Sequence, residues 1–269
     1  IPRCIRDVHG EDLGRTVFEF NKALIDAVAD LVPAVKLQIA FYEALGLEGL
    51  RAYRETADYA KERGLLVIGD IKRGDISSTA EAYRDAHLFG HFRCDAVTLN
   101  PFLGYDSVEP FLKACSRDGK GVFILVKTSN PSSGDLQNLK VGDEYLYQYL
   151  AGKVAEWGRD LLGKYGYSSV GAVVGATYPG ELKELRRIMP HTPLLLPGYG
   201  AQGAGGRDVA AAFDDKGLGA VVNSSRALAG AYLKAEKPEC VTVEGFKKYT
   251  RDEALRMRDD ITDAIKTGT

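Results

Sequence analysis

The sequence predicts an α/β fold of the (β/α)8 barrel class, with the first strand apparently missing from the chain as given. Short, continuous apolar stretches alternate with stretches whose apolar residues recur at helical spacing. This is the pattern of parallel strands covered by helices. Almost every predicted strand is also followed at once by polar or charged residues, and the active sites of barrels are built at the carboxyl ends of their strands.

Seven strands are expected, over residues 34–40, 65–71, 96–100, 121–127, 170–174, 193–196 and 220–222. Helices are expected over 18–31, 49–63, about 79–89, 107–116, about 145–165, 179–189, about 207–213 and 243–266. Seven strands are one short of a barrel, and the missing strand would precede the first helix. A doubly wound open sheet is the alternative, but no GxGxxG follows the first strand.

Composition narrows the class of protein. The chain has 269 residues, 45% of them hydrophobic, and no linker divides it, so residues 1–269 are expected to form one domain. The last helix, with its charge cluster at 251–260, is expected to lie on the surface with that cluster solvated. A net charge of −2 gives no case for nucleic acid or a membrane surface, and no apolar run approaches the ~18 residues of a membrane span. Four scattered cysteines indicate reduced thiols in a cytoplasmic protein.

A glycine-rich stretch indicates a phosphate site. Gly198, Gly200 and Gly203 follow one strand and let backbone N–H groups approach a ligand, and Arg226 opens the short helix after the next strand. Glycine-rich turns, a helix N-terminus and an arginine are typical of phosphate binding. Barrels often hold phosphate after their last two strands.

A cluster of alternating charge follows the strand at 65–71. Asp70 and Lys72 share one face of a strand, Asp75 follows in a turn, and Lys36 on the neighbouring strand could reach the same space. Two lysines between two carboxylates would keep each group charged. A structural salt-bridge cluster is the alternative interpretation.

Four motifs together resemble one enzyme family. Residues 70–75 (DIKRGD), 127–131 (KTSNP), 197–203 (PGYGAQG) and 223–226 (NSSR) are similar to the signatures of orotidine 5'-phosphate decarboxylase, in particular its longer bacterial branch. The resemblance runs from about residue 18 to the end of the last strand.

The resemblance implies decarboxylation of orotidine 5'-monophosphate to UMP, without a metal or an organic cofactor. It implies that Lys36, Asp70, Lys72 and Asp75 form a catalytic charge network, in which the Lys72 ammonium stabilises and then protonates a carbanion at C6. It also implies a homodimer with shared sites, and loops at 129–137 and 202–207 that close over the substrate. The remaining substrate-binding residues would be Thr79, which serves the neighbouring subunit's site, Ser129 on the pyrimidine, and Gln202, Gly203 and Arg226 at the phosphate.

One departure and two alternatives remain open. Members of the family begin with a strand that ends in an aspartate, and the chain as given lacks it. A Mg²⁺-dependent sister of the same barrel group, such as a hexulose-phosphate synthase, shares DxKxxD but has an acidic residue where this chain has Lys36. A phosphate-ligand binding protein without catalysis is the second alternative.

Overall fold

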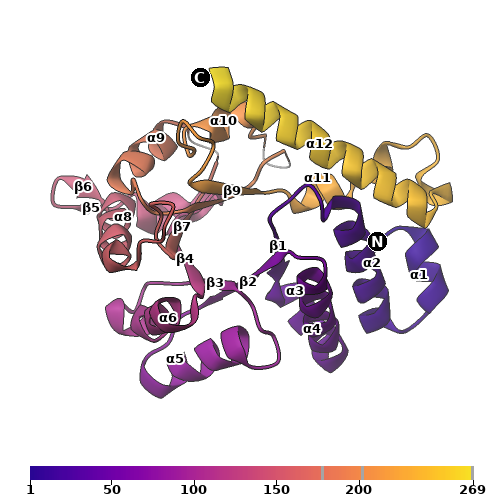
Figure 1. The fold of residues 1–269 in the computed structure, drawn as a ribbon, viewed down its shortest axis with the longest axis horizontal. Coiled ribbons are helices and arrows are strands. Elements are labelled where there is room, and N and C mark those ends of the chain that lie inside the picture. The colour runs from indigo at the N-terminus through magenta and orange to yellow at the C-terminus, as the bar shows by residue number, and fades with distance from the viewer. Residues whose placement is uncertain (177–178, 201–202, 268–269) are drawn as a thin grey trace. The chain divides into compact units, whose positions relative to one another are not determined.

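The computed structural model describes residues 1–176, 179–200 and 203–267. The chain divides into two compact units. Their helices and strands are labelled in Figure 1. Unit 1 contains Ile1–Ile71, Asp85–Ala96 and Ser225–Arg258, and unit 2 contains Lys72–Arg84, Val97–Ser224 and Asp259–Thr269. The expectation of a single domain stays a prediction.

The main sheet is parallel and follows the chain order, β1-β2-β3-β4-β7-β8-β9. A doubly wound sheet reverses its strand order at a switch point, and this order has no reversal among the described strands. The barrel-like parallel sheet is therefore confirmed, whereas the missing first strand stays a prediction. The strands are β1 Ala34–Gln38, β2 Leu66–Arg73, β3 Ala96–Leu99, β4 Gly121–Lys127, β7 Val170–Val174, β8 Leu194–Pro197 and β9 Ala220–Asn223.

Unit 1 is built on helices that pack beside β1 and the start of β2. Its helices are α1 Arg3–His9, α2 Leu13–Val28, α3 Ile39–Glu43, α4 Gly46–Glu62, α11 Ser225–Ala229 and the first part of α12 Val243–Thr267, with a π-helix at Asp85–Phe89 and short 3-10 turns at Ala231–Lys234 and Pro238–Cys240. Asp12 caps α2 by accepting a hydrogen bond from the Arg15 backbone N–H, at 2.8 Å. The strand expected over 34–40 is too long, because Ile39 and Ala40 already begin α3.

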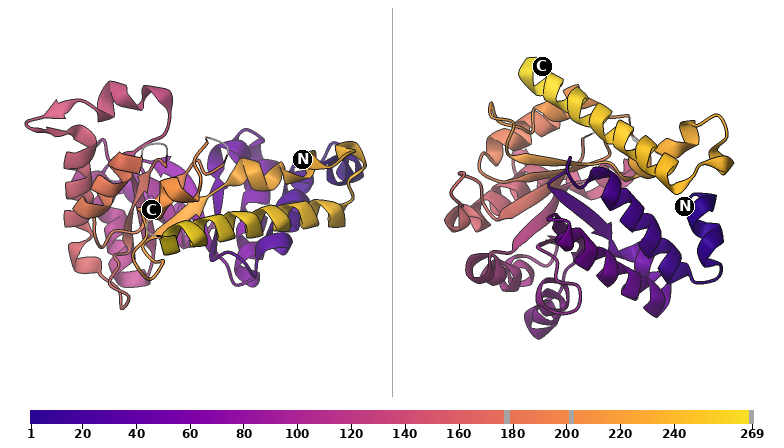
Figure 2. Two further views of the ribbon diagram at one scale, coloured as in Figure 1. Left: turned by 90° about the horizontal axis from the view of Figure 1, so that it is seen from above. Right: turned by 45° about the vertical axis from the view of Figure 1, so that its right-hand side comes forward.

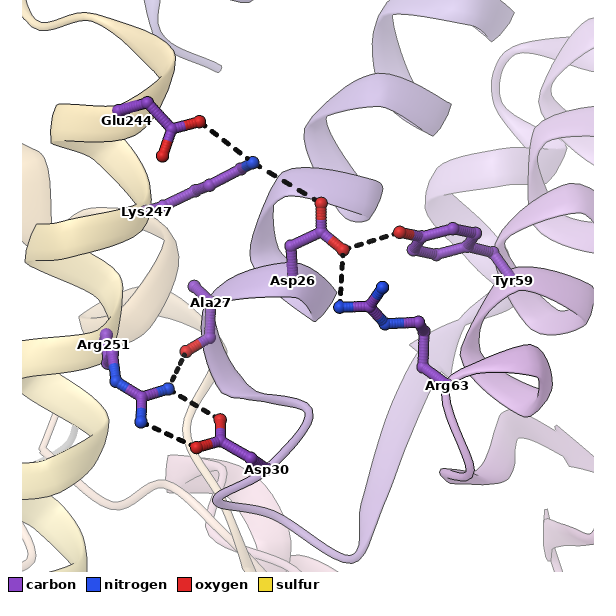
Figure 3. A network of polar contacts seen from close by, with 8 residues as sticks. All are labelled: Asp26, Ala27, Asp30, Tyr59, Arg63, Glu244, Lys247 and Arg251. Carbon is purple, nitrogen blue, oxygen red and sulfur yellow. Dashed lines mark hydrogen bonds and ion pairs between the residues drawn. The ribbon is translucent and has the colours of Figure 1, made fainter.

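Ion pairs hold the first part of α12 to α2 and to the turn after it, and side chains at the end of α4 contact the same α2 carboxylate (Figure 3). Asp26 accepts a hydrogen bond from the Tyr59 hydroxyl at 2.6 Å, and its carboxylate also lies near Arg63 and Lys247, at 3.3 and 3.5 Å. One turn further along α12, Arg251 contacts both carboxylate oxygens of Asp30, at 2.6 and 2.7 Å.

The prediction that residues 251–260 form a solvated helix face is therefore wrong in part. Glu253 is only 6% exposed and forms ion pairs with Lys234 and Arg256, at 2.8 and 2.6 Å. Burial of a carboxylate requires compensation, and the Lys234 and Arg256 side chains supply it for Glu253.

Unit 2 contains β3 (from Val97), β4, β7, β8 and β9, with helices between them. Its helices are α5 Ser77–Arg84, α6 Tyr105–Asp118, α7 Gly134–Gln137, α8 Leu146–Trp157, α9 Pro179–Ile188 and α10 Gly206–Ala210, with 3-10 turns at Pro131–Ser133 and Arg159–Leu161. The helix expected over 79–89 ends as α-helix at Arg84 and continues as the π-helix.

The helix expected over 145–165 is wrong in its second half, since α8 ends at Trp157. Gly158 follows it, where an added Cβ would lie 2.7 Å from the Ser168 hydroxyl oxygen, so close packing ends the helix. The hairpin β5 Lys140–Val141 with β6 Glu144–Tyr145 was not predicted, and it projects from the rest of unit 2 (Figures 1 and 2).

Two general expectations can be compared with the structure. The four cysteines are free thiols. None of the helices within the described ranges is both long and apolar enough to cross a bilayer. The cytoplasmic location stays a prediction.

Candidate active site

A buried ion pair joins β1 to β2 in unit 1. The parallel register places Gln38 beside Asp70, and Lys36 lies two residues earlier on the same strand. The Lys36 ammonium donates to Oδ2 of Asp70 at 2.5 Å, and the Gln38 amide donates to the same oxygen at 3.0 Å. The side chains of Lys36 and Asp70 are only 11% and 8% exposed. The prediction that Lys36 reaches the space of Asp70 is confirmed.

Gln38 was missed by the sequence interpretation. Alternate residues of a strand share a face, so the signal was its spacing of two from Lys36. Its amide restrains the Asp70 carboxylate from the side, and the two donors together compensate a charge that would otherwise be costly to bury.

Lys72, at the end of β2, has an unusual backbone. Its φ is 47°, in the left-handed region that residues with a Cβ rarely adopt. The Lys72 backbone N–H donates to the hydroxyl oxygen of Thr98 on β3, at 3.0 Å, and Thr98 is 1% exposed. Such strain persists only where neighbouring contacts hold it, and it gathers at functional sites. The Lys72 side chain itself is exposed.

The turn after Lys72 lies tightly against the end of β3. The Asn100 backbone N–H donates to the Arg73 carbonyl at 2.9 Å, and a Cβ on Gly74 would lie 2.7 Å from the Asn100 carbonyl oxygen. Only glycine fits that approach. The next residue, Asp75, is half-buried and accepts from the Ile76 backbone N–H at 2.8 Å. Thr79 is exposed on the first turns of α5.

A second buried lysine ends β4. The Lys127 side chain is 3% exposed, its ammonium donates to the Asn138 side-chain carbonyl at 2.5 Å, and it lies 3.7 Å from the Glu181 carboxylate. It also lies over the Tyr147 ring, 4.7 Å from the centroid. Burial, helped by nearby carboxylates including Glu181, raises the pKa of Tyr147 to about 12. The ring under the ammonium is thus a neutral phenol at physiological pH.

Ser129, two residues after Lys127, begins a loop whose ends are held together by hydrogen bonds. Gln137 accepts from the Thr128 backbone N–H at 2.9 Å and donates to the Thr128 hydroxyl at 2.7 Å. Ser129 is half-buried, and a Cβ on Gly175 after β7 would lie 3.0 Å from its backbone nitrogen. Lys127 with Asn138 and Thr128 with Gln137 therefore tie both ends of the 129–137 loop together.

The glycine-rich loop follows β8 in unit 2. Gly198, Gly200 and Gly203 have φ of 100°, 75° and 87°, which explains the residue type at each position. The Gly203 backbone N–H donates to the Gly200 carbonyl at 3.1 Å. Gln202 lies outside the described residues. Arg226 is exposed on α11 in unit 1, and its joint role with Gly203 stays a prediction.

Sequence comparison gives one family over most of the chain. A sequence model described as the orotidine 5'-phosphate decarboxylase / HUMPS family matches residues 15–239. The orotidine 5'-phosphate decarboxylase of Petrotoga mobilis is 49% identical over 253 residues, which is 93% of this chain and 86% of the relative. The enzyme of the same name from Rhodopirellula baltica is 44% identical over 271 residues, covering 97% and 90% of the two chains.

Solved structures agree with the sequence comparison. The OMP decarboxylase of Leishmania donovani superimposes with a TM-score of 0.72 at 34% sequence identity, covering 90% of this chain and 87% of that one. The segment matched by the family model, residues 15–239, therefore includes all four motifs.

Proposed function

We propose how the charged residues act in this chain, which belongs to the orotidine 5'-phosphate decarboxylase / HUMPS family and converts orotidine 5'-monophosphate to UMP and CO2 in pyrimidine synthesis. The observation that carries the proposal is the buried Lys36–Asp70 pair, followed two residues later by the strained Lys72. A buried charge and a strained backbone two positions apart on one strand are both costly, which favours a functional site over a structural cluster.

Lys72 is the proposed proton donor. Loss of CO2 from C6 of the pyrimidine leaves a carbanion in the plane of the ring, which the π system cannot delocalise. A fixed ammonium beside C6 stabilises this charge in the transition state and then protonates C6 to give UMP. The proton comes from the Lys72 Nζ atom and is recovered from solvent, so the reaction needs no other reactant.

Asp70 and Lys36 would set the electrostatics around the leaving carboxylate. A carboxylate held beside the substrate carboxylate repels it in the ground state, and this repulsion ends when CO2 leaves. Two hydrogen bonds from Lys36 and Gln38 hold the Asp70 carboxylate in place. A carboxylate with such partners cannot rotate away from the substrate at low cost.

Binding energy would come from the two loops. Ser129 would hydrogen-bond the pyrimidine, and Gln202, Gly203 and Arg226 would hold the phosphate. The phosphate lies far from C6, so its contacts would supply energy that closes the loops and aligns Lys72 with the ring.

The site would be completed by a second copy of the chain, with Asp75 and Thr79 reaching the partner's substrate. Exposed apolar side chains near these residues support this part of the proposal: Ile76 is 49% exposed and Phe102 is 84% exposed. Large apolar side chains exposed on one chain are common where a second subunit covers them.

Subunit complementation tests the shared site. We expect Lys72→Ala and Asp75→Asn each to abolish activity, and a refolded mixture of the two variants to recover up to about a quarter of it. Each mixed dimer would contain one intact site, because both substitutions fall in its other site. A mixture as inactive as its components, with dimers present by ultracentrifugation, would overturn the shared site.

Turnover in EDTA tests the rest of the mechanism. We expect loss of orotidine 5'-monophosphate absorbance at an unchanged rate in excess EDTA, with that rate lost in Lys72→Ala. The Mg²⁺-dependent sisters would lose activity to the chelator. The relatives at 44% and 49% identity are named as decarboxylases. The Lys36 ammonium lies where the sister enzymes have an acidic residue, and its positive charge opposes a bound metal ion.

A further inference from the structure

The glycine-rich loop is held from a part of the chain that the family model does not reach. The match to the family ends at residue 239, and α12 begins at Val243. From the last part of α12, Asp260 accepts the Tyr199 hydroxyl at 2.5 Å and the Gly206 backbone N–H at 2.7 Å, both on the same oxygen, Oδ2. One carboxylate therefore fixes both sides of the loop.

Tyr199 is the centre of this arrangement. It stands between Gly198 and Gly200, and its side chain is 2% exposed, an unusual burial for a residue of a glycine-rich turn. Its hydroxyl reaches Asp260, and its carbonyl accepts the Ser224 hydroxyl at 3.2 Å. Ser224 follows β9, two residues before Arg226. Tyr199 is thereby bonded to the residue after β9 through its backbone and to α12 through its side chain.

The fit against α12 is close. A Cβ on Gly206 would lie 2.4 Å from the Asp260 backbone carbonyl oxygen, so no other residue type allows this approach. Charged acceptors form short, strong hydrogen bonds to hydroxyl and backbone donors. Gly206 and the last turns of α12, from Asp259 on, are therefore closely packed within unit 2.

We propose that Asp260 is a positioning residue that holds Tyr199 and Gly206, on the two sides of the glycine-rich loop, in place for phosphate binding. This inference rests on the proposed role of that loop and assigns α12 a part in substrate affinity. A preorganised loop binds its anion without a further ordering cost. Asp260 itself does not contact the substrate.

Competitive inhibition by UMP and by uridine tests the proposal. UMP carries the 5'-phosphate and uridine lacks it. A defect in the phosphate-binding loop therefore weakens the binding of UMP but not that of uridine. In Tyr199→Phe and Asp260→Ala we expect the inhibition constant of UMP to rise about tenfold and that of uridine to stay within about twofold. Asp263→Ala is the matched control, because Asp263 lies one turn later on α12, is exposed like Asp260 and has no hydrogen bond to the described part of the loop, so both inhibition constants should equal those of the wild type.

Two results would overturn the proposal. One is a UMP inhibition constant within twofold of wild type in both variants. The other is an equal rise for uridine, which would indicate a general structural defect. If Asp260→Ala does not fold, Tyr199→Phe decides alone, because it keeps the buried ring and removes only the hydroxyl.

Arg226→Ala separates this inference from the proposed function. If it leaves UMP inhibition unchanged, the phosphate assignment itself fails. If it weakens UMP while Tyr199→Phe and Asp260→Ala do not, only the role of Asp260 fails.

Discussion

The Lys36 ammonium lies 2.5 Å from the Asp70 carboxylate, and both side chains are about nine-tenths buried. The pair links neighbouring strands whose register places Gln38 against Asp70. Removal of one partner from such a pair leaves a buried charge uncompensated, which costs more than the pair contributes.

We therefore expect Lys36→Met to abolish activity and to lower the free energy of unfolding by about 3 kcal/mol, measured by urea denaturation. Lys248→Met is the matched control, because Lys248 and Asp252 form a pair at 2.8 Å with side chains 75% and 55% exposed. Exposed pairs contribute little, so its unfolding curve should superimpose on that of the wild type. Equal curves for both variants would contradict the structural importance of the buried pair.

Thr98→Val should lower kcat about tenfold or more while Thr98→Ser stays near wild type. Valine keeps the shape but loses the hydroxyl that accepts the Lys72 N–H, so the strained backbone of Lys72 relaxes. Steady-state kinetics measure the effect, and the expected signature is a fall in kcat with a small change in KM. An equal loss in the serine variant would show that packing, not the hydrogen bond, matters.

Asn138→Ala should raise KM for orotidine 5'-monophosphate about tenfold, because it frees Lys127 from the end of the loop that begins at Ser129. The Lys127 ammonium still lies 3.7 Å from the Glu181 carboxylate in this variant, so the buried charge keeps one partner. Lys140→Ala, an exposed residue two positions further on, is the control and should leave KM unchanged. A wild-type KM in Asn138→Ala would show that the hydrogen bond between Lys127 and Asn138 plays no part in substrate binding.

Stability should depend on pH through Asp30 and Arg251 (Figure 3). Hydrogen bonds from Arg251 hold the pKa of the Asp30 carboxyl at about 2, below its ordinary 3.8. A lowered pKa in the folded state stabilises the protein above the ordinary value, and this contribution is lost as pH falls through the lowered one.

We expect the urea midpoint of Arg251→Gln to lie below that of the wild type by a constant amount above about pH 5. That difference should shrink between about pH 4 and pH 2, and high salt should reduce it at neutral pH because the pair is exposed. A difference that stayed constant down to pH 3 would contradict the assignment to Asp30.

The sequence predicted best those elements whose pattern is local. The bounds of β4 and β7 match the prediction, because each is a continuous apolar run with a clear end. Contacts between distant residues were not accessible to such patterns. Asp260 and Tyr199 are 61 positions apart, and nothing in the charge cluster of α12 distinguished the buried Glu253 from its solvated neighbours.

The candidate site divides in the same way. Motif spacing predicted Asp70 and Lys72, and the neighbouring strand added Lys36. Gln38, Thr98 and the partners of Lys127 follow instead from strand register and from contacts between the ends of a loop. The hairpin β5–β6 was missed because strands of two residues are too short to have a period.

Because Lys72 has a left-handed backbone, the residue type that favours stability at this position differs from the one that favours activity. Alanine has a Cβ too, so Lys72→Ala keeps the strain and removes only the ammonium, whereas glycine relieves the strain by roughly 1 kcal/mol. Lys72→Gly should therefore be an inactive protein that melts at a higher temperature than Lys72→Ala. A library selected for heat resistance alone would accumulate glycine at position 72, and only selection for growth without added pyrimidines would restore lysine.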